Sequence, residues 1–148
     1  MIDVCTSTSG SVVGLMEVDR SEVPAYGVVA PETEMLDGVV KIADLVEKPA
    51  IDEAPSSLII VGRYVLTVDI FEEIAQLPLG VGGELQLTDA IRAQAQRSPL
   101  HGVETMVNRW DIGTPAGFLT AAVEMAFLGG GVEGLDGELS NIVERHRL

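Results

Sequence analysis

The run from Ser56 to Leu66 constrains the fold of this chain more than any other stretch. Its residues are apolar nearly throughout, with aliphatic and β-branched side chains predominating. A continuous apolar run without alternation is typical of a strand that is buried on both faces of a sheet. We therefore expect a central strand here. Asp69 follows it, and Glu72 stands three residues later at the spacing of a helix capping box, so we expect a helix to come next.

Strand and helix patterns also surround this central run. Valine-rich runs before it predict three strands, and after it helices alternate with one more strand. The predicted strands are Ser11–Val18, Tyr26–Val29, Val39–Val46 and Gly102–Trp110, and the predicted helices are Asp69–Leu77, Gln86–Arg97, Thr114–Gly129 and Glu138–His146. The last two helices are expected to bury apolar stripes, made by Phe118, Leu119, Ala122, Val123 and Ala126 and by Leu139, Ile142 and Val143. This order predicts an α/β fold in which helices pack on a largely buried sheet.

Length and composition narrow the class of protein. The 148 residues suit a single domain over residues 1–148, and 47% hydrophobic residues are enough to form a substantial core. No apolar run is long enough to span a membrane, and the first residues lack the pattern of a secretory signal. A single cysteine, Cys5, suits a reducing, cytoplasmic location. The net charge of −14 argues against nucleic-acid binding, because phosphate backbones require clusters of Lys and Arg.

A pair of opposite charges stands where the third predicted strand ends. Glu47 and Lys48 follow the apolar run and are themselves followed by Pro49. Because proline disfavours the helical region for the residue before it, we expect Lys48 to stay extended. Strand ends are where α/β proteins hold ligands. The same tripeptide also suits an ordinary solvated strand exit, and the residues alone leave both interpretations open.

Three other positions are candidates for ligand contacts. Asp111 follows the last predicted strand and precedes a helix, where a carboxylate can hold Mg²⁺. It suits a solvated turn equally well. Gly27 and Gly62 lie within strand patterns, where a missing side chain lets a backbone or a ligand approach, although close packing accounts for both as readily.

The helix that follows the glycine-rich loop begins with polar residues. Glu84, Thr88 and Asp89 lie near its start. We interpret Thr88 and Asp89 as capping residues in preference to ligand contacts. No phosphate-binding loop and no Ser/His/Asp or Cys/His set is recognisable. The residues alone therefore predict an α/β domain with candidate positions for sugar and phosphate ligands at strand ends, and go no further.

Several segments, in the same order and spacing, resemble those of the bacterial UTP–glucose-1-phosphate uridylyltransferase family. They are Tyr26–Val29, Val46–Pro49, Ala54–Leu58, Val61–Leu66, Gly83–Ile91 and Trp110–Thr114. The resemblance extends from about Val12 to the last helices. It implies a nucleotide-diphospho-sugar transferase fold, which is Rossmann-like, with a mixed sheet and flanking helices.

The resemblance also implies a reaction and a set of site residues. UTP and glucose 1-phosphate would give UDP-glucose and pyrophosphate, with Mg²⁺ as cofactor. Glu47 would bind glucose hydroxyls, Lys48 the phosphates as the catalytic lysine, and Gly27 the sugar through its backbone. The remaining assignments are Val61 and Gly62 in the sugar pocket, Glu84 as a further substrate-binding residue, and Asp111 as one carboxylate of the metal site.

The sequence departs from the family pattern in one large respect. Family members are about twice as long, and the Gly-x-Gly-Thr-Arg pattern that binds UTP in them is absent here. We therefore expect the carboxyl-terminal, sugar-binding half without the nucleotide-binding half, and an unpaired edge in its sheet. The partner would be a separate amino-terminal half, or a second copy in a homo-oligomer. An inactive chain that binds sugar phosphate or UDP-sugar, and a domain without a ligand, are the alternatives.

Overall fold

The computed structural model describes residues 1–80, 83–106, 109–110 and 112–146. They divide into two compact units, Met1–Met106 and Val107–Leu148. The first unit contains α1 (Ile2–Thr8), β1 (Ser11–Glu17), the 3₁₀ turn η1 (Val23–Ala25), β2 (Gly27–Pro31), β3 (Val39–Glu47), β4 (Leu58–Val65), α2 (Ile70–Gln76), α3 (Leu87–Ala95) and β5 (Leu100–Glu104); the second contains α4 (Pro115–Leu128) and α5 (Leu135–His146). The expectation of one domain over residues 1–148 stays a prediction, because compactness does not decide whether a chain unfolds in one step.

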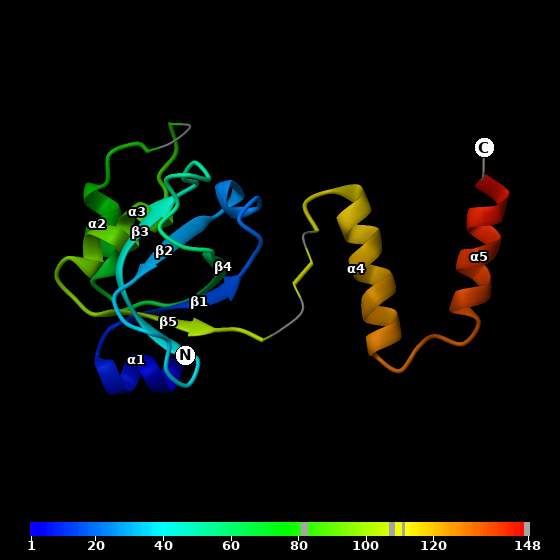
Figure 1. Cartoon of the computed structure of the whole chain (residues 1–148), viewed down its shortest axis with the longest axis horizontal. Helices are drawn as coiled ribbons and strands as arrows, with labels where there is room; N and C mark the ends of the chain where they lie inside the picture. The colour runs from blue at the N-terminus through cyan, green and yellow to red at the C-terminus, as the bar shows by residue number, and fades with distance from the viewer. Residues whose placement is uncertain (81–82, 107–108, 111, 147–148) are drawn as a thin grey trace. The chain divides into compact units, whose positions relative to one another are not determined.

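The five strands of the first unit form a mixed sheet that closes on itself. Their order is β1-β4-β2-β3-β5, and β5 pairs with β1 (Figure 1). The β1–β5 pair is parallel and the other pairs are antiparallel. The predicted mixed sheet is confirmed. The predicted unpaired edge is wrong for the described strands, because each of them has a neighbour on both sides.

Apolar residues lie on both faces of the sheet, which is why the strand sequences show little alternation. Successive residues of a strand point to opposite faces. Val28 and Ile59 belong to one buried cluster, while their neighbours Val29 and Ile60 belong to another. The cluster that contains Val29 and Ile60 also contains Ile91 of α3. Helix α3 contacts both β3 and α2 (Figure 1). The helices therefore cover one face of the sheet, as the apolar runs predicted.

The strand predicted between Ser56 and Leu66 is confirmed as β4, Leu58–Val65, but its predicted burial holds in its first half only. Ile59 and Ile60 of β4 are buried, but the residues after them are partly or fully exposed. Val13 of β1 pairs with Tyr64 and Leu15 pairs with Ile60, so three residues of β4 lie opposite one residue of β1. Gly62 stands in the middle of this bulge with φ 72°. A left-handed backbone here interrupts the ladder, and the local apolar pattern did not reveal it.

The helices of the first unit begin and end close to the predicted positions, with two differences. Asp69 is the N-cap residue of α2, but its side chain makes no capping hydrogen bond, so the predicted capping box is wrong. Helix α1 was not predicted. In α3, Ala90 and Ile91 are fully buried while Leu87 and Ala95 pack against the same cluster, which confirms the predicted apolar side of this helix.

Strand β5, at the end of the first unit, and the helices of the second unit differ more from the expectations. Strand β5 ends at Glu104, whereas we predicted a strand that continues to Trp110. Helix α4 begins as predicted, because Thr114 Oγ1 accepts a hydrogen bond from the Gly117 N–H at 3.0 Å and Pro115 occupies the first turn. The predicted burial of its apolar stripe is wrong, since Phe118 and Leu119 are exposed.

Helix α5 also departs from its prediction. It begins at Leu135, three residues before the predicted start at Glu138. Ile142 and Val143, which we expected to be buried, are exposed. Among the described residues, no helix has the length and apolar character that crossing a membrane requires.

Candidate functional site

The first part of the site forms where β2 begins and β3 ends. Gly27 pairs directly with Glu47 in the antiparallel ladder. The Glu47 side chain is 13% exposed, whereas that of Lys48 is 47% exposed. Lys48 Nζ lies 3.7 Å from Glu47 Oε1. The two predicted residues therefore present a mostly buried carboxylate next to an ammonium group that still reaches solvent.

The backbone of Lys48 corrects one expectation. We predicted an extended conformation, but Lys48 has φ 46°, in the left-handed region. This conformation costs a residue with a side chain roughly 1–2 kcal/mol. The Lys48 N–H donates to the Tyr26 carbonyl oxygen at 3.0 Å, which fixes the turn against β2. Pro49 does keep Lys48 out of the right-handed helical region, but the chain turns away at the strand end instead of continuing.

Helix α3 brings Thr88 to the same place. If Gly27 carried a Cβ atom, that atom would lie 3.0 Å from Glu47 Oε2 and 3.0 Å from Thr88 Oγ1. The carboxylate and the hydroxyl are therefore no more than twice that distance apart. Thr88 is 8% exposed. We refer to Gly27, Glu47, Lys48 and Thr88 as the Glu47 site.

Thr88 is the residue of this site that sequence reasoning missed. We interpreted it as a helix cap, but the N-cap of α3 is Gln86, and Thr88 stands inside the first turn. The signal that could have found it is its spacing. Thr88 precedes the fully buried Ile91 by three residues, so both lie on the face of α3 that packs on the sheet.

Strand β4 borders the site on its other side. Val28 of β2 pairs with Ile59 of β4 in antiparallel fashion. The residues that follow Ile59, Val61 and Gly62, therefore run alongside the start of β2, at the end of the sheet where Gly27 lies. Val61 is partly buried and Gly62 is exposed. Burial raises the pKa of Tyr64 above its usual 10.0, and the negative charge of Glu47 raises it further. The two side chains therefore interact electrostatically.

Two other predicted residues are not brought into this group by the described contacts. Glu84 is exposed in the loop before α3, and its backbone oxygen accepts a hydrogen bond from the Gly80 N–H at 2.8 Å. Asp111, the predicted metal ligand, lies outside the described residues. Within the described part of the chain, no group of three or more His, Cys, Asp or Glu residues could hold a metal ion. The described residues therefore do not by themselves fit a metal site.

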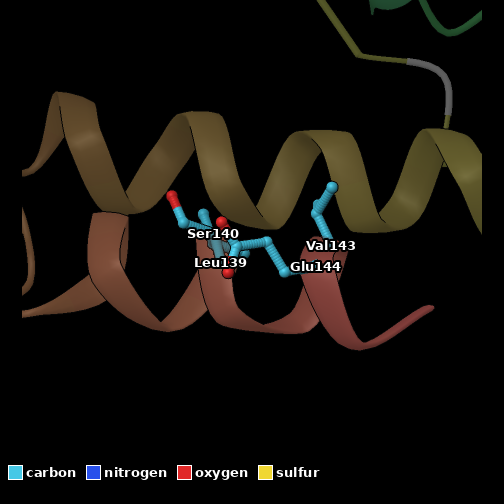
Figure 2. Close-up of a pocket in the computed structure, with 4 residues that line it drawn as sticks. All are labelled: Leu139, Ser140, Val143 and Glu144. Carbon is cyan, nitrogen blue, oxygen red and sulfur yellow. The ribbon is translucent and has the colours of Figure 1, made fainter. Parts of the chain in front are cut away.

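Three pockets lie elsewhere in the described part of the chain. One follows a single side of α5 and is lined by Leu139, Ser140, Val143 and Glu144 (Figure 2). Another surrounds η1 and is lined by Ser21, Glu22, Pro24, Ala25 and Tyr26. Neither of these linings includes a Lys or Arg, which a phosphate ligand requires. The third pocket is lined by Glu138, Asn141, Glu144 and Arg145, and its one arginine stands among two carboxylates that repel a phosphate. The Glu47 site is therefore the better candidate.

The sequence pattern of the family described as nucleotidyl transferase matches residues 3–126. This match covers well over half of the chain. The chain belongs to that family. The fold, with its mixed sheet and flanking helices, is the one that the family resemblance implied.

Individual relatives agree with this assignment. The UTP–glucose-1-phosphate uridylyltransferase of Streptococcus pneumoniae is 40% identical over 126 residues, which are 85% of this chain and 42% of that protein. A solved structure of UDP-glucose pyrophosphorylase complexed with UDP-glucose matches with a TM-score of 0.76 and 38% identity, over 81% of this chain and 45% of its own. The UTP-bound UGPase from Acinetobacter baumannii matches with a TM-score of 0.77 and 26% identity, over 99% of this chain and 49% of its own.

The resemblance to UTP–glucose-1-phosphate uridylyltransferases is thus confirmed. This nucleotidyl transferase chain spans less than half the length of each of these three relatives.

Proposed function

We propose that this chain is the sugar-binding part of a UTP–glucose-1-phosphate uridylyltransferase. The reaction converts UTP and glucose 1-phosphate to UDP-glucose and pyrophosphate. The observation that carries the proposal is the pairing of Gly27 with Glu47, which puts a mostly buried carboxylate and the Lys48 ammonium side by side at one end of the sheet. The relatives that carry this name, and the structure solved with UDP-glucose, support it.

Glu47 is the residue that we assign to the glucose hydroxyls. An ionised carboxylate only accepts hydrogen bonds, and sugar hydroxyls donate them. At 13% exposure the Glu47 side chain meets little competing water. Gly27 is buried, and a Cβ atom on it would lie 3.0 Å from oxygens of both Glu47 and Thr88, so a glycine is the residue that fits beside these two groups. We assign its backbone to the sugar, as the family resemblance implies.

Lys48 is the residue that we assign to the phosphates, in the catalytic role. The phosphate oxygen of glucose 1-phosphate attacks the α-phosphorus of UTP, and pyrophosphate leaves from the opposite side. Negative charge on the phosphoryl oxygens is offset by the Lys48 ammonium, and the protein contributes by positioning and by this charge. The 3.7 Å separation from Glu47 is longer than a hydrogen bond, so the ammonium keeps donors for a phosphate.

The remaining assignments follow the family resemblance. Val61 and Gly62 would line the sugar pocket from β4, and Glu84 would be a substrate-binding residue. Mg²⁺ would be the cofactor, with Asp111 as one of its carboxylate ligands; bound there, it would offset phosphate charge. The reaction would take place in the cytoplasm, which suits a chain with one cysteine.

Ligand titration of the 148-residue chain tests the proposal. We expect isothermal titration calorimetry to detect binding of UDP-glucose and of glucose 1-phosphate. Lys48→Ala should weaken both by about tenfold or more, because it removes a charge-assisted hydrogen bond. Lys41→Ala is the matched control, since Lys41 lies on the same strand but pairs with Glu32 at 2.8 Å. The proposal is wrong if neither ligand binds, or if both substitutions have the same effect.

A further inference from the structure

Helix α3 and strand β3 touch each other at two places. Thr88 and Arg92 are four residues apart in α3 and therefore lie on the same face, one turn from each other. Arg92 contacts Asp44 of β3, and Thr88 lies close to Glu47, three residues further along the same strand. This residue order places α3 antiparallel to β3, and the Arg92–Asp44 contact restrains its position along the strand.

The contact between Arg92 and Asp44 is geometrically specific. Arg92 Nε donates to Asp44 Oδ1 and Nη2 donates to Oδ2, both at 2.6 Å. Asp44 Oδ1 also accepts a hydrogen bond from the Leu45 N–H at 2.8 Å. This bond helps to hold the carboxylate in the orientation in which Arg92 contacts it. A two-point contact between a planar guanidinium and a carboxylate restricts both distance and angle. It therefore restrains the rotation and the height of α3 over β3.

Thr88 is placed so that this restraint matters. Its hydroxyl and the Glu47 carboxylate both lie 3.0 Å from the position that a Cβ atom on Gly27 would take, so the two groups face the same residue. A hydroxyl group both donates and accepts, whereas the carboxylate only accepts. A sugar hydroxyl that donates to Glu47 can therefore accept a hydrogen bond from Thr88. A shift of α3 along the strand would separate the two groups.

We propose that Thr88 is a further sugar-binding residue of the Glu47 site and that the Asp44–Arg92 ion pair positions it. This inference rests on the proposed function, because it concerns the same ligand. Thr88 contacts the sugar, and Arg92 and Asp44 act only through the placement of α3. The ion pair between Lys41 of β3 and Glu32, the residue after β2, includes no helix residue and serves as the comparison. Both of its side chains are 46% exposed, against 49% for Arg92 and 36% for Asp44.

Calorimetric titration of UDP-glucose onto the full 148-residue chain tests both parts. Thr88→Val and Arg92→Ala should each weaken binding by roughly tenfold, since small displacements in a site are costly. Thr88→Ser keeps the hydroxyl and should bind like the unsubstituted chain. Arg92→Lys cannot form the two-point contact and should behave like Arg92→Ala. Lys41→Ala should leave the affinity unchanged.

Two further measurements separate positioning from general destabilisation. Exchange of the pair, with Asp44→Arg and Arg92→Asp together, should restore most of the affinity. In the amide spectrum of the ligand-free chain, Arg92→Ala should shift the Gly27 and Thr88 signals more than Lys41→Ala does. Far-UV circular dichroism identifies any variant that fails to fold, and Thr88→Ser against Thr88→Val then decides the question.

The outcomes distinguish this inference from the proposed function. If the unsubstituted chain binds UDP-glucose and both Thr88→Val and Arg92→Ala bind it equally well, the inference alone is overturned. If the unsubstituted chain binds no UDP-glucose, the proposed function is overturned and the inference with it. Weakened binding in Arg92→Ala without recovery on exchange of the pair overturns the positioning role and leaves Thr88 to be judged by its own variants.

Discussion

Gly27 is the residue at which the Glu47 site is most tightly constrained. The constraint does not come from its backbone angle, because Gly27 is absent from the described glycines that have a positive φ. It comes from space, since a Cβ atom would lie 3.0 Å from an oxygen of Glu47 and from an oxygen of Thr88. Contacts this short force both side chains to move, and both belong to the proposed sugar-binding surface.

Gly27→Ala should therefore separate binding from stability. We expect the affinity for UDP-glucose to fall about tenfold, since both flanking groups are displaced by some tenths of an ångström. The free energy of unfolding should change by no more than about 1 kcal/mol, because the lower entropy of the unfolded chain offsets part of the crowding. Calorimetry and urea denaturation measure the two quantities. A loss of stability as large as the loss of binding energy would assign Gly27 to packing alone.

Asp44 should make the folding stability of the chain depend on pH. The hydrogen bonds from Arg92 lower the pKa of Asp44 below its usual 3.8, with a smaller contribution in the same direction from the Leu45 N–H. A carboxylate with a lowered pKa in the folded state stabilises the protein fully above its unfolded pKa, and this stability is lost as pH falls through the folded value. Asp44→Asn should therefore make the free energy of unfolding less steep in pH below about 4. Identical slopes with and without the substitution would show that the pair contributes nothing in solution.

The site residues differ in how far the sequence revealed them. Glu47 and Lys48 stood out as a charged strand end, but the residues alone left a ligand site and a solvated exit open, and only the family resemblance favoured the site. Gly27 was recognisable as a glycine inside a strand pattern. Thr88 was not, because a threonine near a helix start is more often a cap, and only the packing of α3 on β3 distinguishes the two roles. The left-handed conformation of Lys48 could not be predicted from the sequence either. A following proline disfavours the right-handed helical region but does not select between the extended and the left-handed regions.

Two ion pairs near α3, one made by Arg92 within the helix and one by Arg97 after it, differ in how deeply their carboxylates are buried. Burial should change how much each pair contributes to the free energy of unfolding. Arg92 and Asp44 are both well exposed, whereas Glu73 of α2 is 7% exposed and pairs with the exposed Arg97 that follows α3. An exposed pair contributes about 0–1 kcal/mol to stability. Removing one partner of a buried pair costs about 3–5 kcal/mol, because the other charge stays buried without compensation.

Arg97→Ala should destabilise the chain by about 1–3 kcal/mol, less than for a fully buried pair because the Arg97 side chain is itself 63% exposed. Arg92→Ala should cost less than about 1 kcal/mol. Urea denaturation at neutral pH measures both. Adding Glu73→Gln to Arg97→Ala should recover much of the loss, since it removes the buried charge. Equal costs for the two arginine substitutions would contradict the expected role of burial. The small cost at Arg92 would also agree with a pair whose contribution is to position α3.

Sequence patterns predicted the strands well where an apolar run marks both ends of the strand. They predicted poorly the strand ends and bulges that depend on pairing with residues distant in the sequence. The strands β1, β2 and β3 follow apolar runs and were predicted within one or two residues of their observed ends. The end of β5 was missed by six residues, because β3, its neighbour on one side, begins at Val39 and has no residue to pair with β5 beyond Val103. The bulge at Gly62 depends in the same way on the register with β1.

At the scale of the molecule, the closed sheet explains why the proposed sugar site is preformed. The ends of β2, β3 and the β4 bulge are held by strand pairing, and α3 is held by an ion pair and by the buried cluster around Ile91. With a net charge of −14, the chain as a whole repels anionic ligands. A phosphate therefore has to be attracted locally, and Lys48 is the cation that the site offers.

This chain alone has candidate groups for the sugar and one phosphate, but no recognisable pattern for binding UTP. We expect it to bind UDP-glucose but to form none from UTP, glucose 1-phosphate and Mg²⁺. The sequence contains no Gly-x-Gly-Thr-Arg pattern to hold the triphosphate, and one lysine cannot both neutralise and align two phosphorylated substrates. A coupled assay of pyrophosphate release measures turnover, with a full-length uridylyltransferase of this family as the positive control. Mg²⁺-dependent turnover by the purified chain that disappears in Lys48→Ala would contradict this prediction and show that residues of this chain also bind UTP.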